Sequence, residues 1–204
     1  MKNINKQLIV FLLSLLFVYL MQVYTFNNEK IFWYLYTFTL LVGMTISILS
    51  AQFKDELPTW KYLIFGIGYG TILYGFVWIG EIFFLWFNPS LTKDISSFLN
   101  SFGPQNIWHY LLLIFIIVIG EEMFWRGYIQ QYLKKFMRPI LAVLVSTILF
   151  SLSLAISGFV LGSIAAVIAG FILGGLYEWK KSLPLVIVAH IVFVLLLFLI
   201  LPIV

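Results

Sequence analysis

Two adjacent glutamates, an arginine and a histidine stand out because they lie inside stretches that are otherwise apolar. Glu121, Glu122 and Arg126 fall mid-way along one apolar stretch, and His190 lies early in the last one. An ionisable side chain in the hydrocarbon of a bilayer costs roughly 2.5–3.5 kcal/mol on insertion scales. Two carboxylates, a guanidinium and an imidazole kept at that cost indicate a functional site.

The spacing of Glu121, Glu122 and Arg126 predicts different roles for them. Glu122 and Arg126 are four residues apart, so on a helix they share one face and can form an ion pair. Glu121 is rotated by about 100° from Glu122 and has no partner nearby in the sequence. A carboxylate in a dry site suits general-base chemistry on water. The alternative is that the ion pair only pins helices together, while Glu121 bonds to a neighbouring backbone.

Glu81 is a further carboxylate within an apolar stretch, residues 62–87. It lies a few residues from the expected end of that helix at Phe87, so its side chain can extend to the membrane interface. The sequence predicts no particular role for it.

The composition is that of a membrane protein. Of the 204 residues, 63% are hydrophobic and 10% are charged, against about 45–50% and about 25% in soluble domains. So few polar groups cannot cover a surface in water, which predicts lipid surroundings and a single transmembrane domain over residues 1–204. Cysteine is absent, which excludes disulfides, thiolate nucleophiles and cysteine metal sites. The basic residues are scattered, so no nucleic acid partner is expected.

A membrane-crossing helix needs roughly 20 apolar residues, and about seven stretches come near this length. The interruptions between them carry charge, proline or glycine, and the division at Ser157-Gly158 is the weakest because no charge marks it. The first stretch exceeds the roughly 7–15 residues of a secretory signal and is expected to be retained. The expected spans are residues 8–26, 31–51, 62–87, 107–133, 139–157, 159–178 and 184–203. We therefore expect an all-α fold, a multi-pass transmembrane helical bundle.

Basic residues gather in alternate connections of this arrangement. One side receives Lys2, Lys6, Lys54, Lys61, Lys134, Lys135, Arg138, Lys180 and Lys181, whereas the other receives only Lys30 and Lys93. Because cytoplasmic connections carry an excess of lysine and arginine, we expect a cytoplasmic N-terminus in a multi-pass protein of the cell membrane. The outer connection, residues 88–106, carries regularly spaced apolar residues that predict a short helix lying on the membrane surface.

Two sequence blocks carry a resemblance to a known family. The stretch Gly120-Glu121-Glu122-Met123-Phe124-Trp125-Arg126-Gly127-Tyr128-Ile129 resembles the EExxxR signature of the CPBP family, also called the Abi family. The stretch Gly170-Phe171-Ile172-Leu173-Gly174-Gly175-Leu176-Tyr177, followed by Ser182-Leu183-Pro184 and His190, resembles the family's GxxxGxLY…LxxPIxxHxxxN block. The two blocks give a family-like core over about residues 107–195. The family includes CAAX prenyl endopeptidases and bacterial relatives of the bacteriocin-immunity type.

The resemblance implies an intramembrane endopeptidase in which the first motif glutamate and a histidine activate water. A second histidine and an asparagine would hold the oxyanion. Carried over by position, Glu121 would be the general base, and Glu122 with Arg126 would organise it. His190 would stabilise the developing oxyanion.

Two positions depart from the family pattern. The FxxxH motif corresponds to Phe150-Ser151-Leu152-Ser153-Leu154, and the HxxxN motif to His190-Ile191-Val192-Phe193-Val194. Leu154 therefore replaces the water-activating histidine, and Val194 replaces the oxyanion asparagine. Losing an oxyanion donor typically costs about 10²–10³ in kcat, and losing an acid–base partner about 10²–10⁴. His109 cannot replace the histidine easily, because it lies about 18 Å from Glu121 along the same expected helix.

Three hypotheses remain open at this point. The first is an intramembrane endopeptidase with Glu121 as base and water as nucleophile. The second is a catalytically silent member that acts as a membrane binding, immunity or regulatory protein. The third is a transporter component that relays protons through Glu81, Glu121 and Glu122, although no internal repeat or pair of interrupted helices supports it.

The expected partners are membrane lipids and a hydrophobic or lipidated peptide, a protein substrate or a membrane-protein partner. No cofactor is expected. A catalytic zinc site needs converging histidines, and only His190 is in place, so no metal is expected either.

Overall fold

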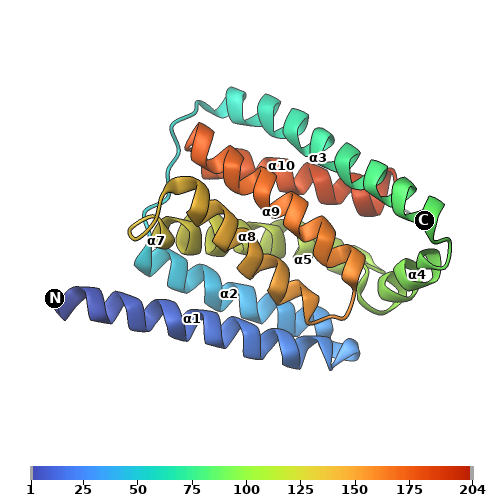
Figure 1. Ribbon diagram of the computed structural model, residues 1–204, viewed down its shortest axis with the longest axis horizontal. Coiled ribbons are helices and arrows are strands. Elements are labelled where there is room, and N and C mark those ends of the chain that lie inside the picture. The colour runs from blue at the N-terminus through green and yellow to red at the C-terminus, as the bar shows by residue number, and fades with distance from the viewer. Residues whose placement is uncertain (1, 203–204) are drawn as a thin grey trace.

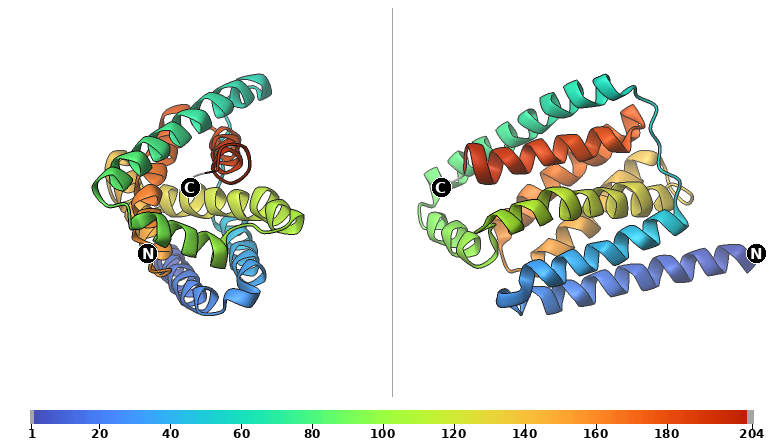
Figure 2. Two further views of the ribbon diagram at one scale, coloured as in Figure 1. Left: turned by 90° about the vertical axis from the view of Figure 1, so that its right-hand side faces the viewer. Right: turned by 180° about the vertical axis from the view of Figure 1, so that it is seen from behind.

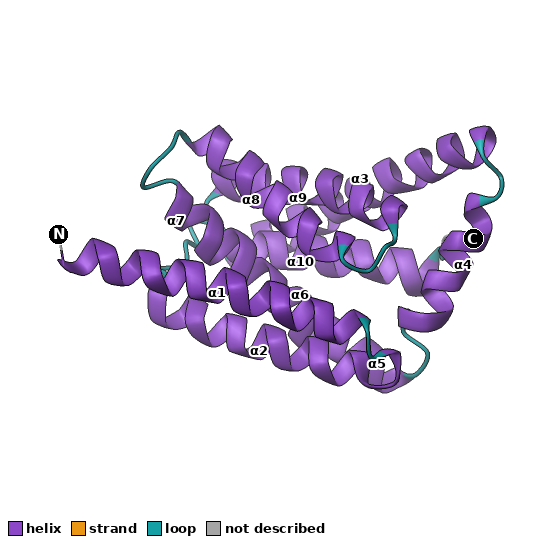
Figure 3. Cartoon of the chain, turned by 60° about the horizontal axis from the view of Figure 1, so that its bottom comes forward, coloured by secondary structure: helices purple, strands orange, loops and turns teal. Residues whose placement is uncertain are grey.

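Helices make up nearly all of the computed structural model, which describes residues 2–202 and the side chains from residue 6 onward. Within residues 2–202 there is no strand, and one isolated bridge joins Asp55 to Ser182 (Figure 3). The helices are α1 (Lys2–Phe26), η1 (Glu29–Ile31), α2 (Phe32–Ser50), α3 (Thr59–Phe87), α4 (Leu91–Phe102), α5 (Ile107–Leu112), η2 (Leu113–Ile117), α6 (Val118–Glu121), η3 (Glu122–Gln130), α7 (Gln131–Leu133), α8 (Pro139–Ala155), α9 (Val160–Lys180), α10 (Leu183–Leu195) and η4 (Leu196–Ile200). The side chain of Lys2 and residue 203, which ends the last expected span, lie outside this description.

Within the described residues, six helical stretches are long and apolar enough to cross a membrane. They are Lys6–Phe26, Glu29–Ser50, Thr59–Phe87, Ile107–Leu133, Val160–Lys180 and Leu183–Ile200. The remaining expected span is α8, a shorter apolar helix. These helices confirm an all-α, multi-pass bundle of about seven spans.

Successive spans reverse direction, so the connections collect at two ends of the bundle (Figures 1 and 2). One end carries the start of α1, residues 51–58, residues 134–138 and the turn between α9 and α10. The other end carries α4 and the end of η4. The basic connections of the sequence thus share one end, whereas the placement of that end in the cytoplasm stays a prediction.

Local chemistry explains where the helices around the last turns begin and end. Gly158, with φ of 77°, lies in the turn after α8, which confirms the division predicted at Ser157-Gly158. Lys181 adopts a left-handed conformation with φ of 50° and ends α9, and Ser182 then caps α10 by accepting a hydrogen bond from the backbone N–H of Leu185. A serine N-cap of this kind satisfies one of the free N–H groups of the first turn.

The helix predicted within residues 88–106 is present as α4. Phe98 stacks on Phe159 with ring centroids 4.4 Å apart, and Phe102 lies against Phe26 and Phe32. These aromatic contacts hold α4 across the end of the bundle opposite the start of α1 (Figure 2). Its position on a membrane surface stays a prediction.

Glycine allows α3 to lie closely along α10 (Figure 1). A Cβ atom at Gly66 would lie 2.6 Å from Val188 Cγ1, and one at Gly70 would lie 2.7 Å from Val192 Cβ. Both distances are shorter than van der Waals contact, so neither position has room for a side chain. Small residues are common where membrane helices approach each other, because association there depends on packing rather than on hydrophobic exclusion.

We predict that Gly70→Ala destabilises the bundle by about 1–3 kcal/mol, the usual cost of overpacking a well-filled interface. Gly75→Ala on the same helix is the control, because no atom lies within 4 Å of a Cβ built there. Alanine favours helices more than glycine by about 0.8–1.0 kcal/mol, so the control should melt at or above the wild-type temperature. Thermal unfolding of the purified protein in detergent measures both, and equal melting of the two variants would contradict the packing described here.

Candidate functional site

The helix that carries the two glutamates widens where they occur. From Ile107 to Leu133 the chain is continuously helical, and the segments η2 and η3 within it are π-helical. A π-helix bonds each N–H to the fifth preceding carbonyl and occurs frequently at functional sites. Glu121 and Glu122 both have α-helical dihedral angles, with φ/ψ of −61°/−48° and −67°/−40°, so the offset of about 100° expected between them stays a prediction.

Glu122 and Arg126 form the ion pair that their spacing predicts. Arg126 Nη1 donates to Glu122 Oε1 over 2.9 Å, and the two side chains are 2% and 0% exposed. The guanidinium also lies over the ring of Phe150, 4.7 Å from its centroid, where a cation is attracted to the aromatic face. The pair therefore joins η3 to α8 as well as joining two turns of its own helix.

His190 brings α10 to the same carboxylate. Its Nδ1 lies 2.7 Å from Glu122 Oε1. An ionised carboxylate accepts hydrogen bonds but cannot donate them, so with Glu122 ionised beside Arg126 the imidazole Nδ1–H is the donor. This contact fixes the orientation of the ring and directs Nε2 toward Glu121, whose Oε2 is 3.8 Å away.

Glu121 has a hydrogen-bond partner that the sequence did not reveal. The hydroxyl of Tyr36 on α2 donates to Glu121 Oε1, and both side chains are buried. The two residues are 85 positions apart. Tyr36 belongs to a run of aromatic residues that also fits an interfacial belt, so nothing local in the sequence distinguishes it.

The site opens into a cavity of about 310 Å³ whose wall is mostly aliphatic and aromatic. Glu121, His190 and Tyr36 line it from α6, α10 and α2. Leu154 and Val194 line the same cavity. The two positions at which the resemblance implies polar residues therefore line the cavity, but their side chains offer no hydrogen bond.

The remaining candidates lie apart from the ion pair. Glu81 on α3 lines the cavity, and its carboxylate has no hydrogen bond or ion pair within the part of the chain that the structure describes. His109 stacks on Trp33 with ring centroids 4.6 Å apart and does not line the cavity, which agrees with its exclusion from the predicted site. Within residues 2–202, no group of three or more histidine, cysteine or carboxylate side chains is arranged to hold a metal ion.

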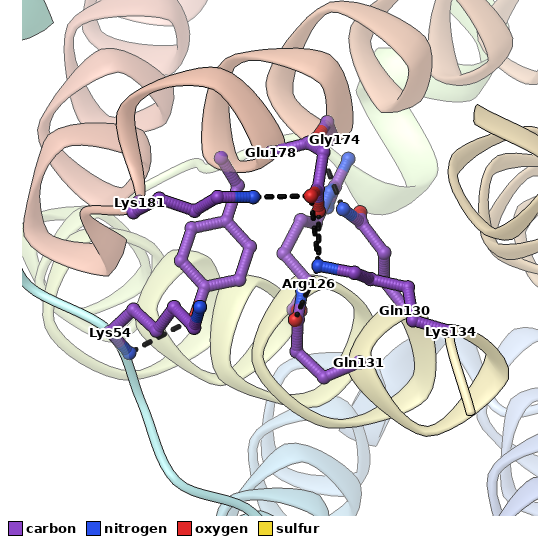
Figure 4. Close-up of polar contacts among 9 residues, drawn as sticks. Lys54, Arg126, Gln130, Gln131, Lys134, Gly174, Glu178 and Lys181 are labelled. Atoms are coloured by element: carbon purple, nitrogen blue, oxygen red, sulfur yellow. Dashed lines mark hydrogen bonds and ion pairs between the residues drawn. The ribbon is translucent and has the colours of Figure 1, made fainter. Parts of the chain in front are cut away.

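A second polar cluster holds the other end of η3 (Figure 4). Lys134 Nζ lies 2.7 Å from Glu178 Oε2, and Lys181 pairs with the same carboxylate. Gln130 Nε2 donates to the backbone carbonyl of Gly174 over 3.1 Å. A Cβ atom at Gly174 would lie 2.9 Å from Gln130 Oε1 and 3.1 Å from Val143 Cγ1, so a side chain here would require both neighbours to shift.

The site lies within a segment of the chain that matches a known protein family. Residues 103–196 match the family model described as type II CAAX prenyl endopeptidase Rce1-like. This segment is similar to the family of type II CAAX prenyl endopeptidases. The match confirms the resemblance carried by the two sequence blocks and covers just under half of the chain. No curated protein and no solved structure matches the chain.

The Rce1-like segment contains Glu121, Glu122, Arg126 and His190. The helices α1, α2 and α3 lie outside it, although α2 supplies Tyr36 and α3 supplies Glu81 to the wall of the cavity. Part of the cavity wall is thus built by residues that the family match does not cover.

We predict that Glu122→Ala destabilises the protein by about 3–5 kcal/mol, because it leaves the buried charge of Arg126 without a partner. Glu81→Ala removes a carboxylate that makes no ion pair within the described residues, so it serves as the control and should melt close to the wild type. Thermal unfolding in detergent compares the two variants. A Glu122→Ala protein that melts with the wild type would show that the ion pair does not support the fold.

Proposed function

We propose that this chain is an intramembrane endopeptidase of the CPBP type, in which Glu121 activates a water molecule that hydrolyses a peptide bond within or near the membrane. The observation that carries the proposal is the pair of atoms Glu121 Oε2 and His190 Nε2, 3.8 Å apart at the wall of the cavity. A water molecule can lie within hydrogen-bonding distance of both atoms at once. The other side-chain oxygen and the other ring nitrogen are engaged by Tyr36 and Glu122.

The proposed reaction starts with Glu121 ionised and His190 protonated. Two carboxylates, one guanidinium and one imidazolium sum to zero charge, and paired charges are much less costly to bury than uncompensated ones. In this state Nδ1–H donates to Glu122, and Nε2–H faces Glu121 and the cavity. The site then offers both a proton acceptor, Glu121, and a donor for a developing oxyanion, His190.

The reaction that follows uses only these groups, water and the peptide. Glu121 takes a proton from water as the water oxygen bonds to the carbonyl carbon, and the carbonyl π electrons move to its oxygen. The Nε2–H of His190 donates a hydrogen bond to that oxyanion. When the electron pair returns, the C–N bond breaks and Glu121 gives its proton to the departing amine, which leaves a carboxylic acid and an amine as products.

The cavity favours a hydrophobic or lipidated substrate. Its volume of about 310 Å³ is at the lower end of the roughly 300–1,000 Å³ of ligand sites, and its wall is almost entirely apolar. The name of the matched family, CAAX prenyl endopeptidase, points in the same direction, because a prenylated peptide has an apolar tail beside its scissile bond. We propose membrane peptides or lipidated protein ends as substrates, and the cell membrane as the location.

A catalytically silent binding protein is the second candidate, and one observation favours it. Leu154 and Val194 present aliphatic side chains to the cavity where the family pattern has water- and oxyanion-binding residues. An apolar lining makes an ordered water less stable, because a buried water needs polar partners. In this case the cavity would hold a membrane-protein partner or a lipidated tail without cleaving it, as in an immunity or regulatory protein.

Glu121→Gln should abolish cleavage while nearly keeping the shape of the site. We expect the rate to fall by at least about 10², the smaller contribution typical of a general base. The measurement is a comparison of membrane-peptide and protein termini in cells that lack the chain and are complemented with wild type or variant at matched expression. Glu81→Gln is the control, since it makes the same chemical change in the same cavity.

The two candidates give opposite results in this comparison. A terminus produced with wild type and with Glu81→Gln, but absent with Glu121→Gln, supports the endopeptidase and identifies its substrate. Identical termini in all three, together with a cellular phenotype rescued equally by each, would leave the binding protein.

If the chain is an endopeptidase, Val194→Asn should accelerate it. The amide N–H would add an oxyanion donor at the position where the family pattern has one, and such a donor is typically worth about 10²–10³ in kcat. Val194→Ala is the control, because it makes room without adding a donor. Turnover of the substrate found in the preceding comparison measures the gain, and equal rates for the two variants would mean that position 194 does not face the reacting carbonyl.

A further inference from the structure

Among the residues that the structure describes, Tyr36 is the group from outside the Rce1-like segment that hydrogen-bonds to the proposed general base. It lies on α2, and its hydroxyl donates to Glu121 Oε1. The residue is 7% exposed and lines the cavity. Its ring stacks on Phe32 with centroids 5.6 Å apart, so the hydroxyl is held in place by packing rather than by solvent.

A hydrogen bond to one oxygen of a carboxylate fixes the orientation of the group, whereas an unbonded carboxylate can rotate. With Oε1 occupied by the Tyr36 hydroxyl, the second oxygen of Glu121 is the one that faces His190 Nε2, 3.8 Å away. A reacting group whose orientation is already fixed does not lose conformational entropy on reaching the transition state. Only Oε2 is then available to take a proton from water.

The hydrogen bond from Tyr36 matters because two nearby parts of the cavity wall are aliphatic. Leu154 on α8 and Val194 on α10 line the cavity without offering a hydrogen bond. Ser157 also lines it, but its hydroxyl donates to the backbone carbonyl of Leu154. Orientation of Glu121 and its neighbouring water therefore depends on His190 from one side and on Tyr36 from the other.

We propose that Tyr36 is a positioning residue of this site, whose hydroxyl fixes the Glu121 carboxylate and partly replaces the polar contact missing at Leu154. This inference rests on the proposed endopeptidase function. It assigns a role to α2, a helix that the family match does not include.

The test is Tyr36→Phe, which removes the hydroxyl and keeps the ring. A hydrogen bond to a charged group is worth about 1.5–3 kcal/mol, so kcat should fall by about 10- to 100-fold. KM should stay unchanged, because the contact acts on the base rather than on substrate binding. Tyr34→Phe is the matched control: it makes the same change on the same helix at a side chain that is 70% exposed, and it should leave both constants unchanged.

Two further measurements separate positioning from a structural role and from failure of the proposed function. Tyr36→Phe leaves a buried carboxylate oxygen without its partner, so it should melt below the wild type, but still in one cooperative transition above the assay temperature. The infrared carboxyl band of Glu121, identified by its loss in Glu121→Gln, should shift in Tyr36→Phe and not in Tyr34→Phe, whether or not a substrate is cleaved.

The outcomes are distinct. A fall in kcat with an unchanged KM and a shifted band supports the proposal. An active wild type whose kcat and Glu121 band are both unchanged by Tyr36→Phe overturns the role of Tyr36 and leaves the endopeptidase intact. A wild type as inactive as Glu121→Gln overturns the endopeptidase and with it any role of Tyr36 in the reaction.

Discussion

The site depends on one buried carboxylate oxygen. Glu122 Oε1 accepts from Arg126 Nη1 over 2.9 Å and lies 2.7 Å from His190 Nδ1. Removing an ion from water costs several kcal/mol even after the protein relaxes, and a side chain that is 0% exposed keeps its charge only if its partners compensate. Two partners on a single oxygen do this, and they come from η3 itself and from α10. These contacts of Glu122 link η3 to α10 and so contribute to the distance between Glu121 and His190.

The aliphatic side chains of Leu154 and Val194 leave fewer hydrogen-bonding groups in the cavity. If the chain is an endopeptidase as proposed, the resemblance implies that polar residues at the positions of Leu154 and Val194 would share the binding of water and oxyanion. Here the hydrogen-bonding groups that touch Glu121 and His190 are Tyr36 and Glu122, and both act by orienting their partner. Low dielectric strengthens each of these contacts and also raises the cost of any polar group left without one. An endopeptidase built in this way depends more on orientation than on the number of donors, and it is expected to be slow.

Sequence reasoning succeeded where the relevant signal is local or periodic. Apolar length predicted the spans, and the spacing of Glu122 and Arg126 predicted their ion pair. It missed Tyr36, because a contact across 85 positions leaves no trace in one sequence, and an aromatic residue near a helix end fits an interfacial belt equally well. It also missed the π-helical turn at Glu122, since a spacing of four residues fits an α-helix without strain.

The direction from which a substrate reaches Glu121 follows from the cavity wall. Ile95 and Phe98 of α4 line the cavity together with Ser157 and Phe159 of the α8–α9 turn, and these residues lie at the end opposite the basic connections. Glu121 itself lies near the middle of the helical stretch Ile107–Leu133. If the basic end is cytoplasmic, as the distribution of lysine and arginine predicts, the cavity extends from the centre of the bilayer toward its outer face. A tail already dissolved in the outer leaflet could then enter without crossing the membrane, on the side of α4, which packs against the bundle through Ile95, Phe98 and Phe102.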